Sequence, residues 1–95
     1  MKNYTDWKNT TFSEGNFELS AYPNPVSDVV TITVAGLNEV NGTIQLIDFS
    51  GKLIMNKAMN EPTLLLEMKD LCSGVYLIRF KDNEGRTGTL KVVKE

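Results

Sequence analysis

Short runs of alternating apolar and polar residues recur along the chain, separated by residues that form turns. The clearest run is 29–34, where Val30, Ile32 and Val34 alternate with two threonines. A two-residue period is typical of a β-strand with one face on a core and the other in water. The same criterion predicts further strands at residues 19–22, 43–48, 53–58, 63–68, 71–80 and 86–94.

The longest apolar run, residues 71–80, is predicted to be the central strand of the core. Tyr76 and Phe80 fall on one face of such a strand. Val75 and Leu77 fall on the other face, so we expect the start of the strand to be covered on both sides. Each large side chain stabilises the fold by about 1.5–3 kcal/mol when it is buried.

Proline decides the interpretation of two segments. Pro23 and Pro25 follow the first predicted strand, and neither can donate a backbone hydrogen bond. The chain is therefore expected to change direction there. Residues 63–68 also fit a helix, but the segment is short and follows Pro62, which favours a strand.

Two turns combine aspartate with glycine. In residues 48–52, Asp48 can accept hydrogen bonds from amides further along the turn, and Gly51 can adopt a positive φ. Residues 82–85 carry alternating oxygen ligands as a calcium loop does, but the spacing continues into Arg86 and lacks the closing glutamate. Both segments therefore predict hairpin turns, and no metal or cofactor site is expected.

About seven short strands with a turn every 8–12 residues are typical of an antiparallel immunoglobulin-like β-sandwich. The chain has 95 residues and fits one domain, although it lacks the Cys-Trp-Cys pattern of antibody domains. We expect the sandwich to comprise residues 19–95. Residues 1–18 are polar and lack a sustained period, so they are predicted to be a linker, partly disordered.

Composition narrows the possible functions. The chain contains no histidine, which removes the Ser-His-Asp and Cys-His systems and the usual zinc sites, and argues against an enzyme. A net charge of −2 without a basic stripe argues against nucleic-acid binding. No apolar run approaches the roughly 20 residues that span a bilayer, so a membrane-spanning segment is not expected.

Cys72 is the single cysteine, so an internal disulfide is excluded. Because Cys72 precedes an apolar run, we predict a buried and inert thiol. The first residues carry no apolar export signal. If the parent protein is exported, this chain is expected to be a piece of it.

Four stretches taken together resemble the C-terminal sorting domain of type IX secretion cargo, the Por secretion family. The stretches are residues 19–25, 48–52, 71–77 and 90–94, in the order and approximate spacing of that family. The similarity extends from Leu19 to Glu95. The positions that match the family pattern are Tyr22, Pro23, Asn24, Pro25, Asp48, Gly51, Gly74, Val75 and Tyr76.

This resemblance implies a non-catalytic secretion signal that follows an upstream cargo domain. In that family the cargo reaches the periplasm of a Gram-negative bacterium and crosses the outer membrane through the type IX translocon. A sortase-type surface peptidase usually then removes the domain, and the cargo stays at the cell surface or is released. By this analogy, residues 1–18 contain the linker to the cargo and the region of cleavage.

The resemblance also predicts a recognition strand near the end of the chain, formed by Leu90, Lys91, Val92, Val93 and Lys94. A purely structural alternative places Leu90 and Val92 in the core and assigns the lysines to protection of a sheet edge. Both interpretations can hold at once.

Two other functions remain open at this stage. A carbohydrate-binding or adhesive module would stack sugars on exposed aromatic side chains, for which Tyr4, Trp7 and Phe12 are the candidates. A structural spacer would pair with other copies through its open sheet edges.

Overall fold

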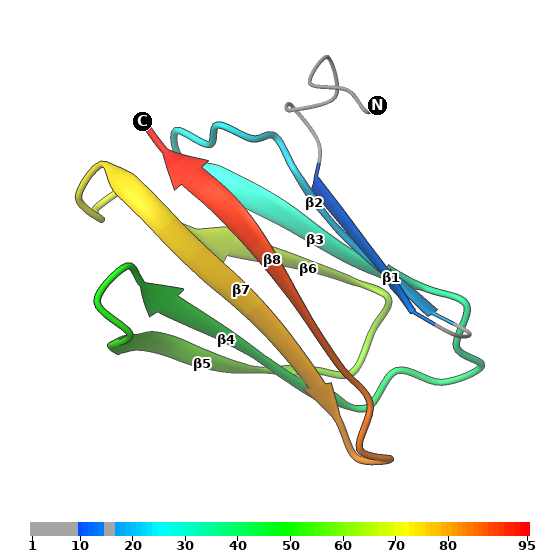
Figure 1. The fold of residues 1–95 in the computed structure, drawn as a ribbon. Coiled ribbons are helices and arrows are strands. Elements are labelled where there is room, and N and C mark those ends of the chain that lie inside the picture. The colour runs from blue at the N-terminus through cyan, green and yellow to red at the C-terminus, as the bar shows by residue number, and fades with distance from the viewer. Residues whose placement is uncertain (1–9, 15–16) are drawn as a thin grey trace.

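A computed structural model describes residues 10–14 and 17–95, which form two four-stranded sheets that face each other (Figure 1). The first sheet has the order β1-β2-β3-β6, with strands β1 (Thr10–Glu14), β2 (Phe17–Tyr22), β3 (Val29–Ala35) and β6 (Thr63–Glu67). The second has the order β5-β4-β7-β8, with strands β5 (Leu53–Met59), β4 (Gly42–Asp48), β7 (Gly74–Asp82) and β8 (Thr87–Lys94).

All neighbouring strands within the two sheets are antiparallel. This architecture confirms the predicted antiparallel β-sandwich of immunoglobulin-like type. The seven predicted strands are all present, with ends that differ by at most a few residues.

Strand structure begins earlier than the expected position near Leu19. β1 pairs with β2 in a register that sets Thr11 opposite Ser20. β1 carries no sustained apolar alternation, so its hydrogen bonding to β2 was not visible in the sequence pattern. Of the predicted linker, residues 1–9 and 15–16 lie outside the described residues, and the assignment of 1–18 as a linker stays a prediction.

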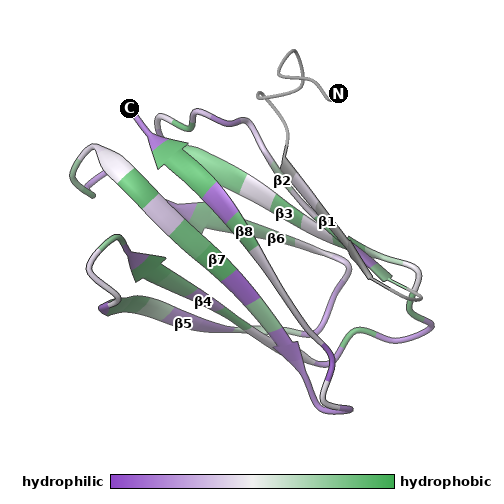
Figure 2. Ribbon diagram, in the orientation of Figure 1, coloured by the Kyte–Doolittle hydropathy of each residue, from purple (hydrophilic) through white to green (hydrophobic). Residues whose placement is uncertain are grey.

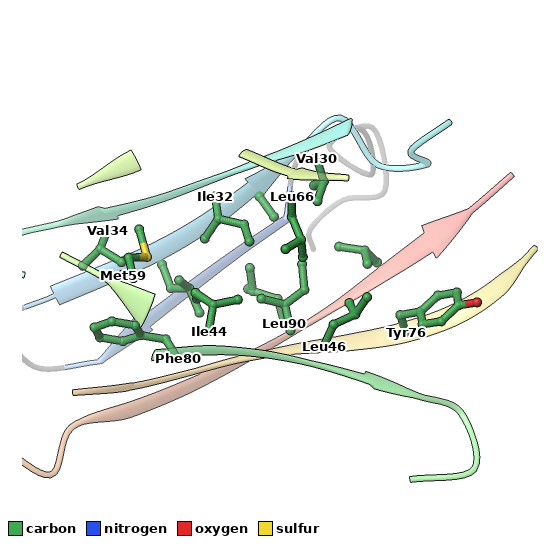
Figure 3. Packing of buried hydrophobic residues seen from close by; sticks show 14 of the residues in the cluster. Val30, Ile32, Val34, Ile44, Leu46, Met59, Leu66, Tyr76, Phe80 and Leu90 are labelled. Carbon is green, nitrogen blue, oxygen red and sulfur yellow. The ribbon is translucent and has the colours of Figure 1, made fainter. Parts of the chain in front are cut away.

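The core lies between the two sheets and is built mainly from alternate residues of β2, β3, β4, β7 and β8, with one buried residue each from β5 and β6. Ile32 from β3 and Ile44 from β4 are fully buried and come from opposite layers (Figure 3). Phe80 is also fully buried, and its ring centroid lies 5.8 Å from that of Phe17. Aromatic rings at this separation and tilt attract each other beyond the gain from burial alone.

β6 confirms the strand interpretation of residues 63–68. It pairs with β3, and Leu66 and Met68 are fully buried, although Met68 itself follows the strand. Leu65 points the other way and keeps 63% of its surface exposed. Alternation of this kind is the mark of a strand with one face in water.

β7 lies inside the second sheet, between β4 and β8, as expected for the central strand. Tyr76, Ile78 and Phe80 are buried on its inner face. The expectation that Val75 and Leu77 are also covered is met only in part, because both lie on the outer face and are half-buried there. In a two-layer sandwich only one face of each sheet meets the core.

Candidate recognition site

The Pro-Asn-Pro segment lies along the outer edge of β8, the edge strand of the second sheet. The side-chain oxygen of Asn24 accepts a 2.8 Å hydrogen bond from the amide of Val93, and its Nδ2 donates to the carbonyl of Lys91 at 3.2 Å. Only 7% of Asn24 is exposed. This amide side chain therefore bonds the edge of β8 as the backbone of a neighbouring strand would.

Val26 continues the contact along β8. Its amide donates to the carbonyl of Val93 at 2.8 Å, and its carbonyl accepts from the amide of Glu95 at 2.9 Å. Val26 forms a parallel bridge with Lys94 and is fully buried. Since the prolines cannot donate, the asparagine side chain and the valine backbone supply the bonds that close this part of the edge.

The predicted kink at Pro23 and Pro25 is present, since the chain leaves β2 there and returns as β3 in the same sheet. The contact with β8 was not predicted. Asn24 and Val93 are 69 residues apart, and no sequence pattern relates an isolated asparagine to a distant strand edge.

The predicted recognition strand divides between core and surface. Leu90 and Val92 are buried in the core, whereas Lys91 and Val93 point outward. Lys94 is only 7% exposed, and its ammonium group donates a 2.9 Å hydrogen bond to the backbone oxygen of Glu95. The role of this strand in recognition stays a prediction.

The β4–β5 turn is organised by Asp48. One carboxylate oxygen accepts hydrogen bonds from the amide of Ser50 at 2.9 Å, from its hydroxyl at 2.7 Å and from the amide of Lys52 at 3.0 Å. Gly51 has a φ of 94°, a conformation that favours glycine. The Ser50 hydroxyl and then the Lys52 amide hold the pKa of Asp48 below its ordinary value.

The β7–β8 turn repeats this arrangement. Asp82 accepts hydrogen bonds from the amides of Glu84 at 3.0 Å and Arg86 at 2.8 Å, and Gly85 has a φ of 91°. The Arg86 guanidinium also lies 3.0 Å from the second carboxylate oxygen. Both turns thus follow the pattern Asp-x-x-Gly followed by lysine or arginine. This repeat was not predicted from the sequence.

Tyr76 joins β7 to the loop before it. Its hydroxyl donates a 2.7 Å hydrogen bond to the carbonyl of Cys72, and burial is the main cause that raises the pKa of this phenol. The prediction that Cys72 is buried is wrong, because its side chain is exposed. The strand begins at Gly74, so Cys72 belongs to the connection outside the sheet and not to the apolar strand.

The four family stretches come together at one end of the sandwich (Figure 1). We call this end the motif end. It comprises the parts of those stretches that lie there and the residues next to them, namely residues 23–28, 48–52, 72–76 and 93–95. The strand register lines up their members, since Asp48 lies opposite Tyr76 and Gly74 lies opposite Lys94. Lys94 in turn pairs with Val26 beside Asn24. Tyr22 ends β2 at this side of the molecule and is 41% exposed.

The motif end contains a hollow of about 300 Å³ between the β4–β5 turn and the start of β7. Phe49 and Val75 line it, together with Ser73 and the backbone of Gly74. Phe49 keeps 85% of its surface exposed. A large aromatic side chain that is left in water at the tip of a tight turn is a candidate contact for a partner.

A second hollow, of about 390 Å³, lies at the opposite end, between residues 36–41 and the β7–β8 turn. Its lining is mainly polar, and the Asp82 carboxylate there is already bonded to Arg86 and to turn amides. Within residues 10–14 and 17–95, no group of three or more acidic or cysteine side chains could hold a metal ion. The same part of the chain has no helix with the length and apolar character needed to cross a membrane.

The fold places the chain among immunoglobulin-like β-sandwiches. A solved structure of similar shape is a DUF3244 family protein from Bacteroides vulgatus ATCC 8482, described as having an immunoglobulin-like β-sandwich fold. It superposes with a TM-score of 0.72 and 11% sequence identity, and the match covers 90% of this chain and 94% of the other. At this identity the similarity concerns the fold alone.

Residues 20–95 match the model of the secretion system C-terminal sorting domain. The chain therefore belongs to this family, and the resemblance to the sorting domains of type IX secretion cargo is confirmed. A comparison with curated protein sequences found no match.

Proposed function

We propose that residues 19–95 act as a non-catalytic address, which directs an upstream cargo domain to the type IX translocon for passage across the outer membrane. The observation that supports this proposal most directly is the gathering of the family stretches at the motif end. Asp48, Tyr76, Lys94 and Asn24 come from four separate parts of the sequence, yet they share one end of a rigid sandwich. A folded address requires such a fixed arrangement.

In this proposal, a sortase-type surface peptidase then removes the domain, and the cleavage region lies within residues 1–18. The cargo is delivered to the cell surface or to the medium. The domain itself performs no chemistry. The absence of histidine from the sequence agrees with that role, and the Asp48 and Asp82 carboxylates are used within their own turns.

The contacts of β8 show how the address can be tested without unfolding it. Removal of residues 91–95 would delete the buried Val92 and the partners of Asn24 and Val26, so it would damage the core as well as any recognised surface. Substitution of outward side chains changes the surface and leaves the core intact, so it tests recognition more directly than removal of residues 91–95 does.

The experiment fuses a fluorescent cargo to the N-terminal side of the full 95-residue chain, in a bacterium that has a type IX system. We expect the cargo at the cell surface or in the medium, and we expect it to remain in the periplasm when the chain is omitted. Equal delivery with and without the chain would refute the proposal. Accumulation of the intact fusion in the periplasm would do the same.

A further inference from the structure

β1 belongs to the first sheet, although the sequence pattern placed its residues in the linker. All five of its residues pair with β2, from Thr10 opposite Ala21 to Glu14 opposite Phe17. In an antiparallel pair, the backbone groups that face the neighbouring strand are hydrogen-bonded to it. The main chain of residues 10–14 is therefore held on the fold.

The strand that holds β1 is itself fixed in the core. Phe17, Leu19 and Ala21 of β2 are buried, and β2 pairs with β3 on its other side. β1 also lies near β8, the edge strand of the second sheet. Figure 2 shows apolar and hydrophilic residues following one another along β8, and its Leu90 and Val92 are buried. β1 is thus flanked by two strands that are anchored in the core.

This pairing decides where the main chain can be cut. A peptidase acts on main chain that can enter its active site, so a bond inside a paired strand is cut only after that strand opens. Chain that lies outside the sheets requires no such opening. The bonds within residues 10–14 are therefore poor substrates as long as the domain is folded.

β1 begins at the motif end. Thr10 lies opposite Ala21, and β2 ends one residue later at Tyr22, from which the chain continues into Pro23. Figure 1 shows the start of β1 and the chain end marked C at the same end of the sandwich. The main chain on the N-terminal side of Thr10 therefore joins the fold beside the family stretches.

We infer that the surface peptidase cuts the chain on the N-terminal side of Thr10, at the motif end, and that β1 leaves with the sorting domain. This inference rests on the proposed function and narrows the cleavage region that it places within residues 1–18. The substrate is a main-chain peptide bond. Water adds to its carbonyl carbon and the bond to nitrogen breaks, so that the cargo side ends in a carboxylate and the new amino group stays on the domain.

A cut in the connection between β1 and β2 is the alternative. Residues 15 and 16 join Glu14 to Phe17, and this pair lies at the end of β1 that is remote from the motif end. A cut there would leave β1 on the cargo and still paired with β2. The cargo would then separate only after β1 dissociates from the sheet, whereas a cut before Thr10 separates cargo and domain in one step.

A disulfide lock between β1 and β2 tests which bond is cut. Thr11 and Ser20 lie opposite each other, and the Cα atoms of such partners are about 4.5–5.5 Å apart, within reach of a disulfide. The variant carries Thr11→Cys and Ser20→Cys together with Cys72→Ser, which removes the exposed native thiol. It is fused to the fluorescent cargo in the bacterium with a type IX system, and the oxidising periplasm closes the lock.

We expect the lock to change the rate of cleavage by less than about twofold, because β1 does not have to open. Free cargo should appear on a non-reducing gel, and mass spectrometry should find residues 10–14 in the released domain. A fall in the rate by about tenfold or more would show that β1 must open first. Cargo that separates only after reduction would show a cut between the two locked positions. Either result overturns the inference.

The matched control is a lock that does not hold β1. Glu18→Cys with Ala35→Cys, again with Cys72→Ser, joins β2 to β3 at two exposed positions that lie opposite each other. We expect this variant to be cut as fast as the unaltered chain. Slow cleavage of the β1 lock alone would assign the effect to the opening of β1 and would overturn the inference.

Limited proteolysis of the purified 95-residue chain gives a readout that does not depend on export. A protease of broad specificity should leave a fragment that keeps β1. A first cut within residues 10–18 would overturn the inference. If the purified chain yields the expected fragment but the unaltered fusion stays in the periplasm, the protection by β1 stands and the proposed function fails.

Discussion

At the scale of single residues, Asn24 illustrates how a polar side chain can be essential to an apolar fold. It is almost completely buried, and its amide group satisfies both a donor and an acceptor on the edge of β8. A buried polar group that loses its partner costs more than the hydrogen bond contributed, because water cannot replace the partner. The family motif therefore has a structural reason to carry an amide between its prolines.

Asn24→Ala leaves the amide of Val93 without its side-chain partner. We expect this substitution to lower the free energy of unfolding by about 1–3 kcal/mol, measured by urea denaturation. Ser27→Ala is the matched control, since its hydroxyl bonds only to the exposed Glu95 carboxylate at 3.0 Å. An equal loss of stability in both variants would contradict the role assigned to Asn24.

The second prediction at this scale concerns Cys72. Because its side chain is exposed, the thiol should react with a disulfide reagent in the native protein at a rate close to that in denaturant. Absorbance of the released thiolate gives the rate, and Cys72→Ser provides the blank. A thiol that becomes reactive only after unfolding would show that this part of the β6–β7 connection is buried.

At the scale of elements, the two hairpin turns of the second sheet are built alike and lie at opposite ends of it. Each places an aspartate at the last residue of a strand, and each closes through a glycine with positive φ. The aspartate side chain accepts amides from the residues that follow. These bonds add to the backbone bonds of each turn, in which the aspartate carbonyl accepts from the glycine amide. These turns fix the register of β4 with β5 and of β7 with β8.

The electrostatics of the first turn can be measured directly. The carboxyl of Asp48 should titrate below its ordinary pKa, observed by NMR of its carboxyl carbon, because the Ser50 hydroxyl and the Lys52 amide bond the charged form. Ser50→Ala should raise this pKa toward the ordinary value of about 3.9. Titration of Asp48 in its ordinary range in the unaltered protein would contradict the turn geometry.

The lowered pKa also gives the sign of a dependence of stability on pH. When a carboxyl has a lower pKa in the folded than in the unfolded state, its stabilising contribution is fully present above the unfolded value and is lost as the pH falls through the folded one. The contribution of Asp48 is therefore expected to begin to fall below about pH 4 and to be lost once the pH is below the lowered pKa of the folded state. Because the group is fully exposed, the change should be small and visible mainly as a difference from Ser50→Ala.

At the scale of the whole molecule, the two layers have different outer faces and a shared core. On its outside the first sheet carries glutamates, hydroxyl residues and the exposed Leu65, and the second carries lysine and arginine beside partly exposed apolar residues. The core joins them through side chains such as Ile32 and Phe80. If the folded shape is the address, damage to this core must abolish delivery even though it leaves every surface side chain in place.

Phe80→Ala tests this requirement. Phe80 is fully buried against Phe17, and truncation of such a residue costs about 3–5 kcal/mol, a large part of the 5–15 kcal/mol that stabilises a typical domain. We expect a large fall in the temperature of unfolding and a parallel loss of cargo delivery. Leu65→Ala, on the outer face of the first sheet, should preserve both. Normal delivery by a Phe80→Ala variant that is unfolded at the growth temperature would refute a folded address.

The sequence by itself determined the strands with clear alternation, such as 29–34, and the turns that contain aspartate and glycine, because side-chain period and backbone freedom are local properties. The same local patterns, in their order along the chain, carried the family resemblance. Tertiary structure alone decided that β1 joins the first sheet, that Asn24 bonds the edge of β8 and that Cys72 is exposed. It also decided that Val75 and Leu77 face outward and are only partly covered. Each of these outcomes depends on which distant segments lie beside one another, and no local pattern encodes that.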